Sequence, residues 1–159
     1  MKPPTSAFPR RQRGLAAVET TIILPFLLLL AFLCAEFGRI LMQYNTLNKA
    51  QQDGVRYLAS NATFAGTGVI TLSNTGPDGN GYVTRNLIVY GNAAGTGTPL
   101  LPGLSTGNVT INAPTPGYVR VTVSYVFTPI FGNAFRMFGY GPNLSLNFPL
   151  QSSVQMRAL

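Results

Sequence analysis

The sequence predicts an α+β fold in which one long N-terminal helix packs on a small antiparallel β-sheet. Residues 15–35 form an apolar run of helical length, and apolar residues continue at helical spacing to about residue 59. In the last third of the chain, apolar residues instead alternate with polar ones, as in strands with one buried face. Since helix and sheet each present one apolar face, packing them together is the economical arrangement. A β-sandwich anchored by a separate helix is the alternative.

The first part of the predicted helix has the length and composition of a membrane span. Residues 15–35 amount to 21 residues, about 30 Å of helix, which matches the hydrocarbon core of a bilayer. Arginines at positions 10, 11 and 13 precede the run, so the positive-inside rule places residues 1–13 in the cytoplasm. We therefore expect a single-pass protein in the cytoplasmic (inner) membrane, with a contact to the lipid bilayer along this helix and a kink at Pro25.

Residues 36–59 read as an amphipathic continuation of the same helix. Their apolar stripe has spacings of three and four residues, and it contains Phe37, Ile40, Leu41, Tyr44, Leu47, Gln51, Val55 and Leu58. Charged side chains occupy the other sides. The pattern predicts one helix from about Leu15 to Ala59, whose second half packs on a domain.

Residues 60–159 are expected to form a β-rich domain outside the cytoplasm. Ser60 to Gly81 is rich in Asn, Thr and Gly and reads as a surface loop, and residues 91–107 read as a long connection. Within the first loop, Asp78 is a single carboxylate in a turn sequence. One carboxylate falls short of the several oxygen ligands of a calcium site.

Strand patterns follow the loop. Asn86 to Tyr90 is a short apolar run, and Val109 and Ile111 alternate with polar residues. The clearest strand is Tyr118 to Phe127, where odd-numbered apolar residues alternate with mostly polar even-numbered ones. Thr128 to Met137 suggests a short helix or an irregular segment. A last set of apolar residues shares even parity, namely Leu144, Leu146, Phe148, Leu150, Val154 and Met156; Pro149 fits only an edge strand or a bulge.

The net charge of +7 does not point to a nucleic-acid partner once the charges are located. Four of the eleven basic residues precede Gly14, and without them seven basic residues stand against four acidic ones, a net charge of +3. The remaining arginines are scattered singly, so they form no patch that could follow a phosphate backbone. Nucleic-acid binding is therefore excluded.

The composition also argues against an enzyme. The chain contains no histidine and only four acidic residues, so few side chains could serve in acid–base catalysis or bind a metal ion. We expect no catalytic residue, no metal site and no cofactor. The only cysteine, Cys34, lies in the apolar run, so no intrachain disulfide can form.

Three ordinary interpretations of the N-terminus are available. A secretory signal peptide would be cut near Leu33-Cys34-Ala35, where Leu33 is a poor fit to the small residue required. A lipoprotein signal would use Cys34, but Phe32 and Leu33 precede it. An uncleaved single-pass anchor would give no reason for Gly14 and Glu19.

A fourth interpretation comes from a resemblance. Gly14 followed by Leu15-Ala16-Ala17-Val18-Glu19 resembles the prepilin peptidase site of type IV pilins, where the cut follows the glycine and the glutamate becomes the fifth mature residue. The whole N-terminal region, with its early proline, Glu36-Phe37-Gly38-Arg39 and a helix closing at Arg56-Tyr57, is similar to TadE-like proteins. These are the minor pilins or pseudopilins of the tight-adherence (Flp) pilus system. One departure is Thr20, where relatives tend to carry an aromatic residue.

The resemblance implies a pilin-like fold with four parts: a leader (1–14), a transmembrane helix (15–35), its amphipathic continuation (36–59) and an extracytoplasmic domain (60–159). It also implies processing between Gly14 and Leu15. The partners would be the prepilin peptidase, other pilin subunits and the pilus assembly machinery. A surface pilus is a further location that the resemblance implies. The alternative is an uncleaved single-pass membrane protein with an extracytoplasmic binding domain.

Glu19 has a physical role in this interpretation. A carboxylate within a membrane span is costly, by about 2.5–3.5 kcal/mol at the helix centre and less near an interface. If processing frees Leu15, its new α-amino group can pair with Glu19 of a neighbouring subunit. A mismatched stagger would leave a charge buried and unpaired, so the pair would specify register. The alternative is that Glu19 reaches headgroup water without a partner.

Overall fold

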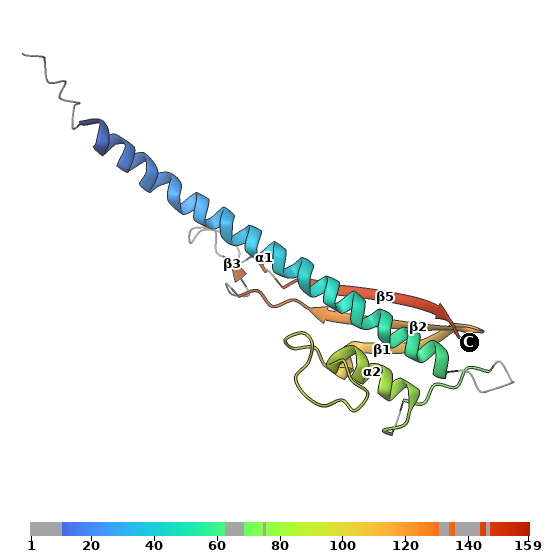
Figure 1. The fold of residues 1–159 in the computed structure, drawn as a ribbon. Helices are drawn as coiled ribbons and strands as arrows, with labels where there is room; N and C mark the ends of the chain where they lie inside the picture. The colour runs from blue at the N-terminus through green and yellow to red at the C-terminus, as the bar shows by residue number, and fades with distance from the viewer. Residues whose placement is uncertain (1–10, 63–68, 75, 131–133, 136–143, 146) are drawn as a thin grey trace, which may run out of the picture. The chain divides into compact units, whose positions relative to one another are not determined.

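The computed structural model describes residues 11–62, 69–74, 76–130, 134–135, 144–145 and 147–159. Figure 1 shows its elements in chain order: helices α1 (Arg11–Asn61) and α2 (Asn80–Tyr90), the 3-10 turn η1 (Thr106–Asn108), and strands β1 (Val109–Thr115), β2 (Tyr118–Val126), β3 (Ala134–Phe135), β4 (Leu144–Ser145) and β5 (Pro149–Arg157). The chain divides into two compact units, Met1–Arg39 and Ile40–Leu159. The predicted α+β class is confirmed.

Helix α1 is continuous, as the apolar periodicity predicted. It runs from Arg11 to Asn61, a few residues beyond the predicted bounds at each end. Pro25 lies inside the helix and does not end it. A proline interrupts one backbone hydrogen bond, and the turns on either side carry the helix past it. The kink expected at Pro25 stays a prediction.

The main sheet is antiparallel and has the strand order β1-β2-β5. Val123 of β2 is paired with Val109 of β1 on one side and with Ser152 of β5 on the other. Gly117, with a φ of 80°, lies in the turn between β1 and β2, where its lack of a side chain permits the left-handed conformation. Pro149 is the first residue of an edge strand, the position predicted for it, because proline donates no ladder hydrogen bond. Strands β3 and β4 form a separate pair.

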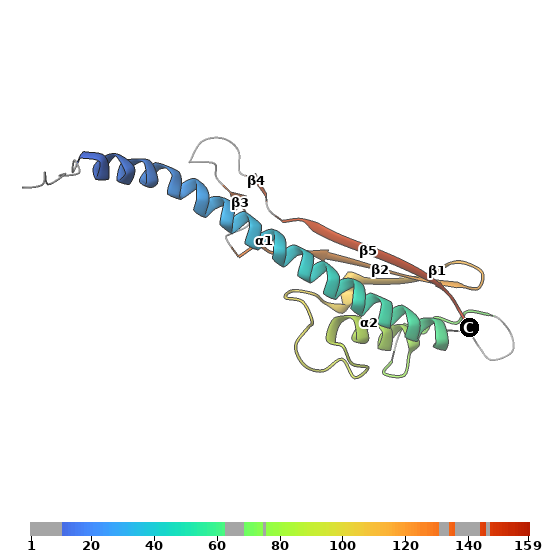
Figure 2. The same ribbon diagram turned by 45° about the horizontal axis from the view of Figure 1, so that its top comes forward.

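The core lies between one face of this sheet and the helices. The alternation predicted for β2 is confirmed, since its odd-numbered residues from Val119 to Tyr125, and then Phe127, are buried. From Ile40 onward, α1 contributes Leu47, Val55, Leu58 and Ala59 to the same cluster, while α2 contributes Ile88 and Val89. In Figure 2, the part of α1 from Ile40 onward runs along β2 and β5, and in Figure 1 α2 lies beside β1. The opposite face of the sheet carries polar pairs, such as Arg120 Nη2 donating to Gln155 Oε1 at 2.7 Å.

The strand predicted at Asn86 to Tyr90 was wrong, because these residues form the second half of α2. A run of three apolar residues fits a strand and a helix equally well, and length decides between them. Here the helix begins at Asn80, inside the segment predicted as a loop, and buries Val83, Thr84, Ile88 and Val89 at helical spacing. Gly91 ends it in the left-handed conformation with a φ of 73°, and its N–H donates to the Leu87 carbonyl.

Parts of two other expectations lie outside the described residues. Within Thr128 to Met137, predicted as a short helix or irregular segment, the structure describes residues 128–130 and the short strand β3. Of the even-numbered apolar series, Leu144 belongs to β4, Leu146 lies outside the described residues, and the later members from Leu150 lie half-buried in β5. Leu150, Val154 and Met156 pack against the core, so the predicted parity is confirmed there.

Helices α1 and α2 meet at Gly54, which is buried. A Cβ atom built there would lie 2.5 Å from Ile88 Cγ1 and 2.8 Å from Ile88 Cδ1, and Ile88 is fully buried. Gly54 therefore permits the close approach of the two helices. Gly38 on the same helix has no neighbour within 4 Å of a built Cβ.

We predict that Gly54→Leu lowers the free energy of unfolding of the domain by about 3 kcal/mol, the upper end for overpacking a core. Urea denaturation of the full chain in detergent micelles, followed by tyrosine fluorescence, measures this. The matched control is Gly38→Leu, which places the same side chain in open space and should cause no loss. Equal stability of the two variants would contradict the packing described here.

Candidate functional site

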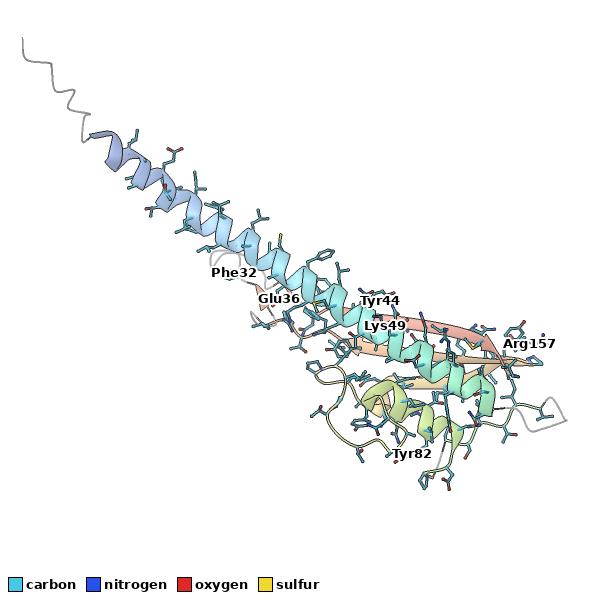
Figure 3. All side chains as sticks on the ribbon, in the orientation of Figure 1. Phe32, Glu36, Tyr44, Lys49, Tyr82 and Arg157 are labelled. Atoms are coloured by element: carbon cyan, nitrogen blue, oxygen red, sulfur yellow. The ribbon has the colours of Figure 1, made fainter. Side chains whose placement is uncertain are left out.

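The first unit of the chain presents an apolar helix surface to its surroundings. Leu15, Ile22 and Phe26 are 75%, 62% and 59% exposed, and the described large apolar side chains up to Leu33 are nearly all exposed. By length and composition α1 can cross a membrane. Figure 3 shows side chains, Phe32 among them, projecting from the first half of α1. Such a surface requires cover by lipid or by other helices.

Two of the polar side chains near the start of the span are satisfied by the helix itself. Thr20 Oγ1 donates to the Ala16 carbonyl at 2.8 Å, and Thr21 Oγ1 donates to the Ala17 carbonyl at 2.8 Å. These threonines therefore enter a membrane without an unpaired donor.

Glu19 differs from its threonine neighbours. Its side chain is exposed, and no hydrogen bond or ion pair joins it to any side chain or backbone group that the structure describes. The next charged residue along the helix is Glu36, and its Oε2 accepts from Arg39 Nη1 at 2.9 Å. Between these two acids the sequence carries no charge. The span thus contains one carboxylate available to a partner, near its N-terminal end.

Gly14 and Leu15, the predicted processing site, lie in the first turns of α1. Both are exposed, and no described atom lies within 4 Å of a Cβ built on Gly14. Glycine is a poor helix former, and the first turn has N–H groups without intrahelical acceptors. Opening this turn to present an extended peptide therefore costs little. Glu19 lies on the same face as Leu15, one turn further on, about 6 Å along the axis.

The polar contacts between α1 and the sheet were not foreseen from the sequence. Gln51 is fully buried, and its Nε2 donates to the Val121 carbonyl at 2.7 Å and to the Ser152 carbonyl at 3.1 Å. Asn48 lies one helical turn before Gln51, and its Oδ1 accepts from Ser152 Oγ at 2.7 Å. The sequence offered one signal for such a contact: a polar glutamine stands at a position of the apolar stripe, where burial requires a hydrogen-bond partner. These bonds fix α1 to β2 and β5.

The described residues offer little for metal chemistry. No three His, Cys, Asp or Glu side chains among them gather at one place. The absence of a cofactor or metal stays an expectation drawn from composition.

Comparison with known proteins supports the N-terminal resemblance. Residues 14–56 match the family model described as TadE-like protein. No curated protein and no solved structure matches the chain. The match begins at Gly14 and covers Glu19, the apolar span and most of the segment that packs on the sheet. Helix α1 from Gly14 to Arg56 is therefore similar to TadE-like proteins, which bears out the resemblance seen in the sequence.

Proposed function

We propose that this protein is a minor pilin, or pseudopilin, that takes part in assembly of a tight-adherence type IV pilus. The observation that carries the proposal is an exposed apolar helix with a single free carboxylate one turn after Leu15, within a TadE-like match. TadE-like proteins are structural components of a pilus system, so the role requires no catalytic site. A helix of this kind serves first as a membrane anchor and then as the packing surface between subunits.

The proposed maturation starts from a single-pass protein of the cytoplasmic membrane. The basic residues before Gly14 stay in the cytoplasm and the domain from residue 60 onward lies outside, by the positive-inside rule. Prepilin peptidase then cleaves between Gly14 and Leu15. Cleavage removes the leader with its four basic residues and creates an α-amino group, with an unperturbed pKa of about 8, at the edge of the membrane.

In the proposed assembly step, Glu19 of one subunit pairs with the Leu15 amine of its neighbour. Both groups lie at the end of an apolar surface, where an unpaired charge is costly once neighbouring helices exclude water. The pair therefore selects the stagger at which the helices pack.

Processing is tested by the intact mass of the protein purified from membranes of its host. We predict a mature chain that begins at Leu15, and we predict that Gly14→Val yields the full-length chain because a branched side chain replaces the glycine at the cut. Ala17→Val is the matched control, since it adds the same side chain three residues later and should leave cleavage intact.

The other outcomes each exclude the proposal in a specific way. A wild-type chain that retains residues 1–14 identifies an uncleaved membrane anchor. A chain that begins near Glu36 identifies a secreted protein whose apolar segment was a signal peptide.

A further inference from the structure

A second site lies in the domain, away from the features used above. It is a pocket of about 440 Å³ lined by Asn74, Tyr82, Arg85, Thr106, Gly107 and Val109. The lining comes from three separate parts of the chain: the segment before α2, helix α2 itself, and the turn η1 with the start of β1. Convergence of three segments on one cavity is the usual construction of a small-molecule site.

Hydrogen bonds of asparagine side chains fix the segments next to the residues that line this pocket. Asn80 Nδ2 donates to the Thr71 carbonyl at 2.7 Å and to the Asn61 carbonyl at 3.0 Å, while its Oδ1 accepts from Ser73 N at 2.9 Å. At the turn η1, Asn108 Oδ1 accepts from Ser105 N at 2.9 Å and from Ser105 Oγ at 2.7 Å. The residues beside Asn74 and Thr106 are therefore fixed before any ligand arrives, which lowers the entropic cost of binding.

Arg85 supplies the charge of the pocket. Its side chain is half-buried, and its Nε donates to the Val109 carbonyl at 3.3 Å, which holds the guanidinium at the pocket wall. Among the described residues, no acidic side chain lines the pocket and no ion pair joins Arg85 to a carboxylate. A partly desolvated cation without a counter-charge favours an anionic ligand. The planar guanidinium with free N–H groups matches a carboxylate, which it can bind through two parallel hydrogen bonds.

The other side chains that line the pocket indicate which kind of ligand molecule bears this carboxylate. Tyr82 is 38% exposed on α2, where Figure 3 labels it, and an exposed aromatic face at a pocket offers a flat apolar surface. The Asn74 amide and the Thr106 hydroxyl both donate and accept hydrogen bonds, so they suit hydroxyl groups. A single arginine gives the pocket one positive charge, which balances a monoanion.

We propose that this pocket binds an acidic sugar, with the carboxylate on Arg85, the ring against Tyr82, and hydroxyls on Asn74 and Thr106. This function is separate from the membrane segment and from subunit assembly. It would give the domain a carbohydrate-binding activity whether or not the chain is processed at Gly14.

The test is a nuclear magnetic resonance titration of the ¹⁵N-labelled full chain in detergent micelles with glucuronate. For a ligand of this size we expect a dissociation constant on the order of 1 mM. The largest shifts should belong to Asn74, Tyr82, Arg85 and Thr106. Glucose has the same ring without the carboxylate and should bind at least about tenfold more weakly, because a charge-assisted bidentate contact is lost.

Arg85→Gln should weaken glucuronate binding at least about tenfold, with an unchanged amide spectrum outside the pocket showing that the fold is intact. Arg120→Gln is the matched control on the polar face of the sheet and should bind glucuronate as the wild type does. Tyr82→Leu keeps the charge and removes the flat ring, and should weaken binding of the sugar without affecting that of acetate.

Three results overturn the proposal. Glucuronate binding that is unaffected by Arg85→Gln places the carboxylate elsewhere. Acetate or inorganic phosphate that binds as tightly as glucuronate shows a general anion site and not a sugar site. Saturating glucuronate without shifts in the lining residues shows that the pocket is not occupied.

Discussion

Glu19→Gln is expected to abolish fibres on the cell surface while the protein remains in the membrane at its normal level. The substitution keeps the shape of the side chain and removes its charge, so the Leu15 amine of the neighbouring subunit would be buried without a counter-charge. Breaking a buried pair in this way costs about 3–5 kcal/mol, more than about 100-fold in the equilibrium constant for adding a subunit. Electron microscopy and immunoblots of sheared surface fractions measure the fibres.

Two control variants separate pairing from other effects. Glu19→Asp retains the charge on a shorter side chain and should restore part of the assembly. Thr21→Val replaces a hydroxyl that bonds only within its own helix and should leave assembly unchanged. Normal fibre yield from Glu19→Gln would refute the register role and favour a carboxylate that simply reaches water at the membrane surface.

The second large effect concerns stability and follows from Gln51→Glu. The introduced carboxylate would be fully buried and would face the carbonyl oxygens of Val121 and Ser152, which now accept from the amide. Neither carboxylate oxygen would find a donor at this position, since the present Oε1 of Gln51 has no described partner either. We expect a loss of at least about 3 kcal/mol in the free energy of unfolding at pH 7.

This loss should depend on pH with a defined sign. Burial raises the pKa of the introduced carboxyl group in the folded state above its unfolded value of about 4.3. Well below pH 4.3 the group is neutral in both states, so the charge penalty is absent there, and at pH 4 only a small part of it remains. The penalty grows as the pH rises above 4.3 and becomes constant above the folded pKa.

Urea denaturation at pH 4 and pH 7 measures the difference between variant and wild type. Gln52→Glu is the matched control, because the neighbouring glutamine is exposed and the same change should be nearly neutral at both values. Similar losses for the two variants would show that Gln51 does not occupy a buried position against the sheet.

The parts of the fold that were predictable are those in which one period dominates a long segment. Helix α1 combined an apolar run, uncharged from Thr20 to Ala35, with a continuous apolar stripe. In β2, apolar residues alternated with polar ones from Val119 to Tyr125. Both patterns report which face is buried, and burial is what forms the element. Pro149 was equally informative, because a residue without an N–H is restricted to an edge.

The parts that were missed depend on contacts between distant segments. Helix α2 is short, and its apolar residues do not by themselves distinguish a helix from a strand. Its packing becomes clear only in the fold, where Ile88 lies against Gly54 of α1. Gln51 looked like an ordinary member of a helix stripe, although it bonds strands 70 and 101 residues away. Arg85 appeared as one scattered arginine among several. Sequence periodicity describes one element at a time, so it does not show which side chains the fold gathers.

The kind of bond that holds the domain together has a consequence for its surroundings. Among the described residues from 40 onward, the polar contacts join amides, hydroxyls and backbone carbonyls, apart from the contacts that Arg85 and Arg120 make to neutral partners. The described ion pair lies outside this part, at Glu36 and Arg39. Such contacts are neither screened by dissolved ions nor titrated in mild acid. Fresh water, brine and acidified host fluids should therefore leave the same domain intact.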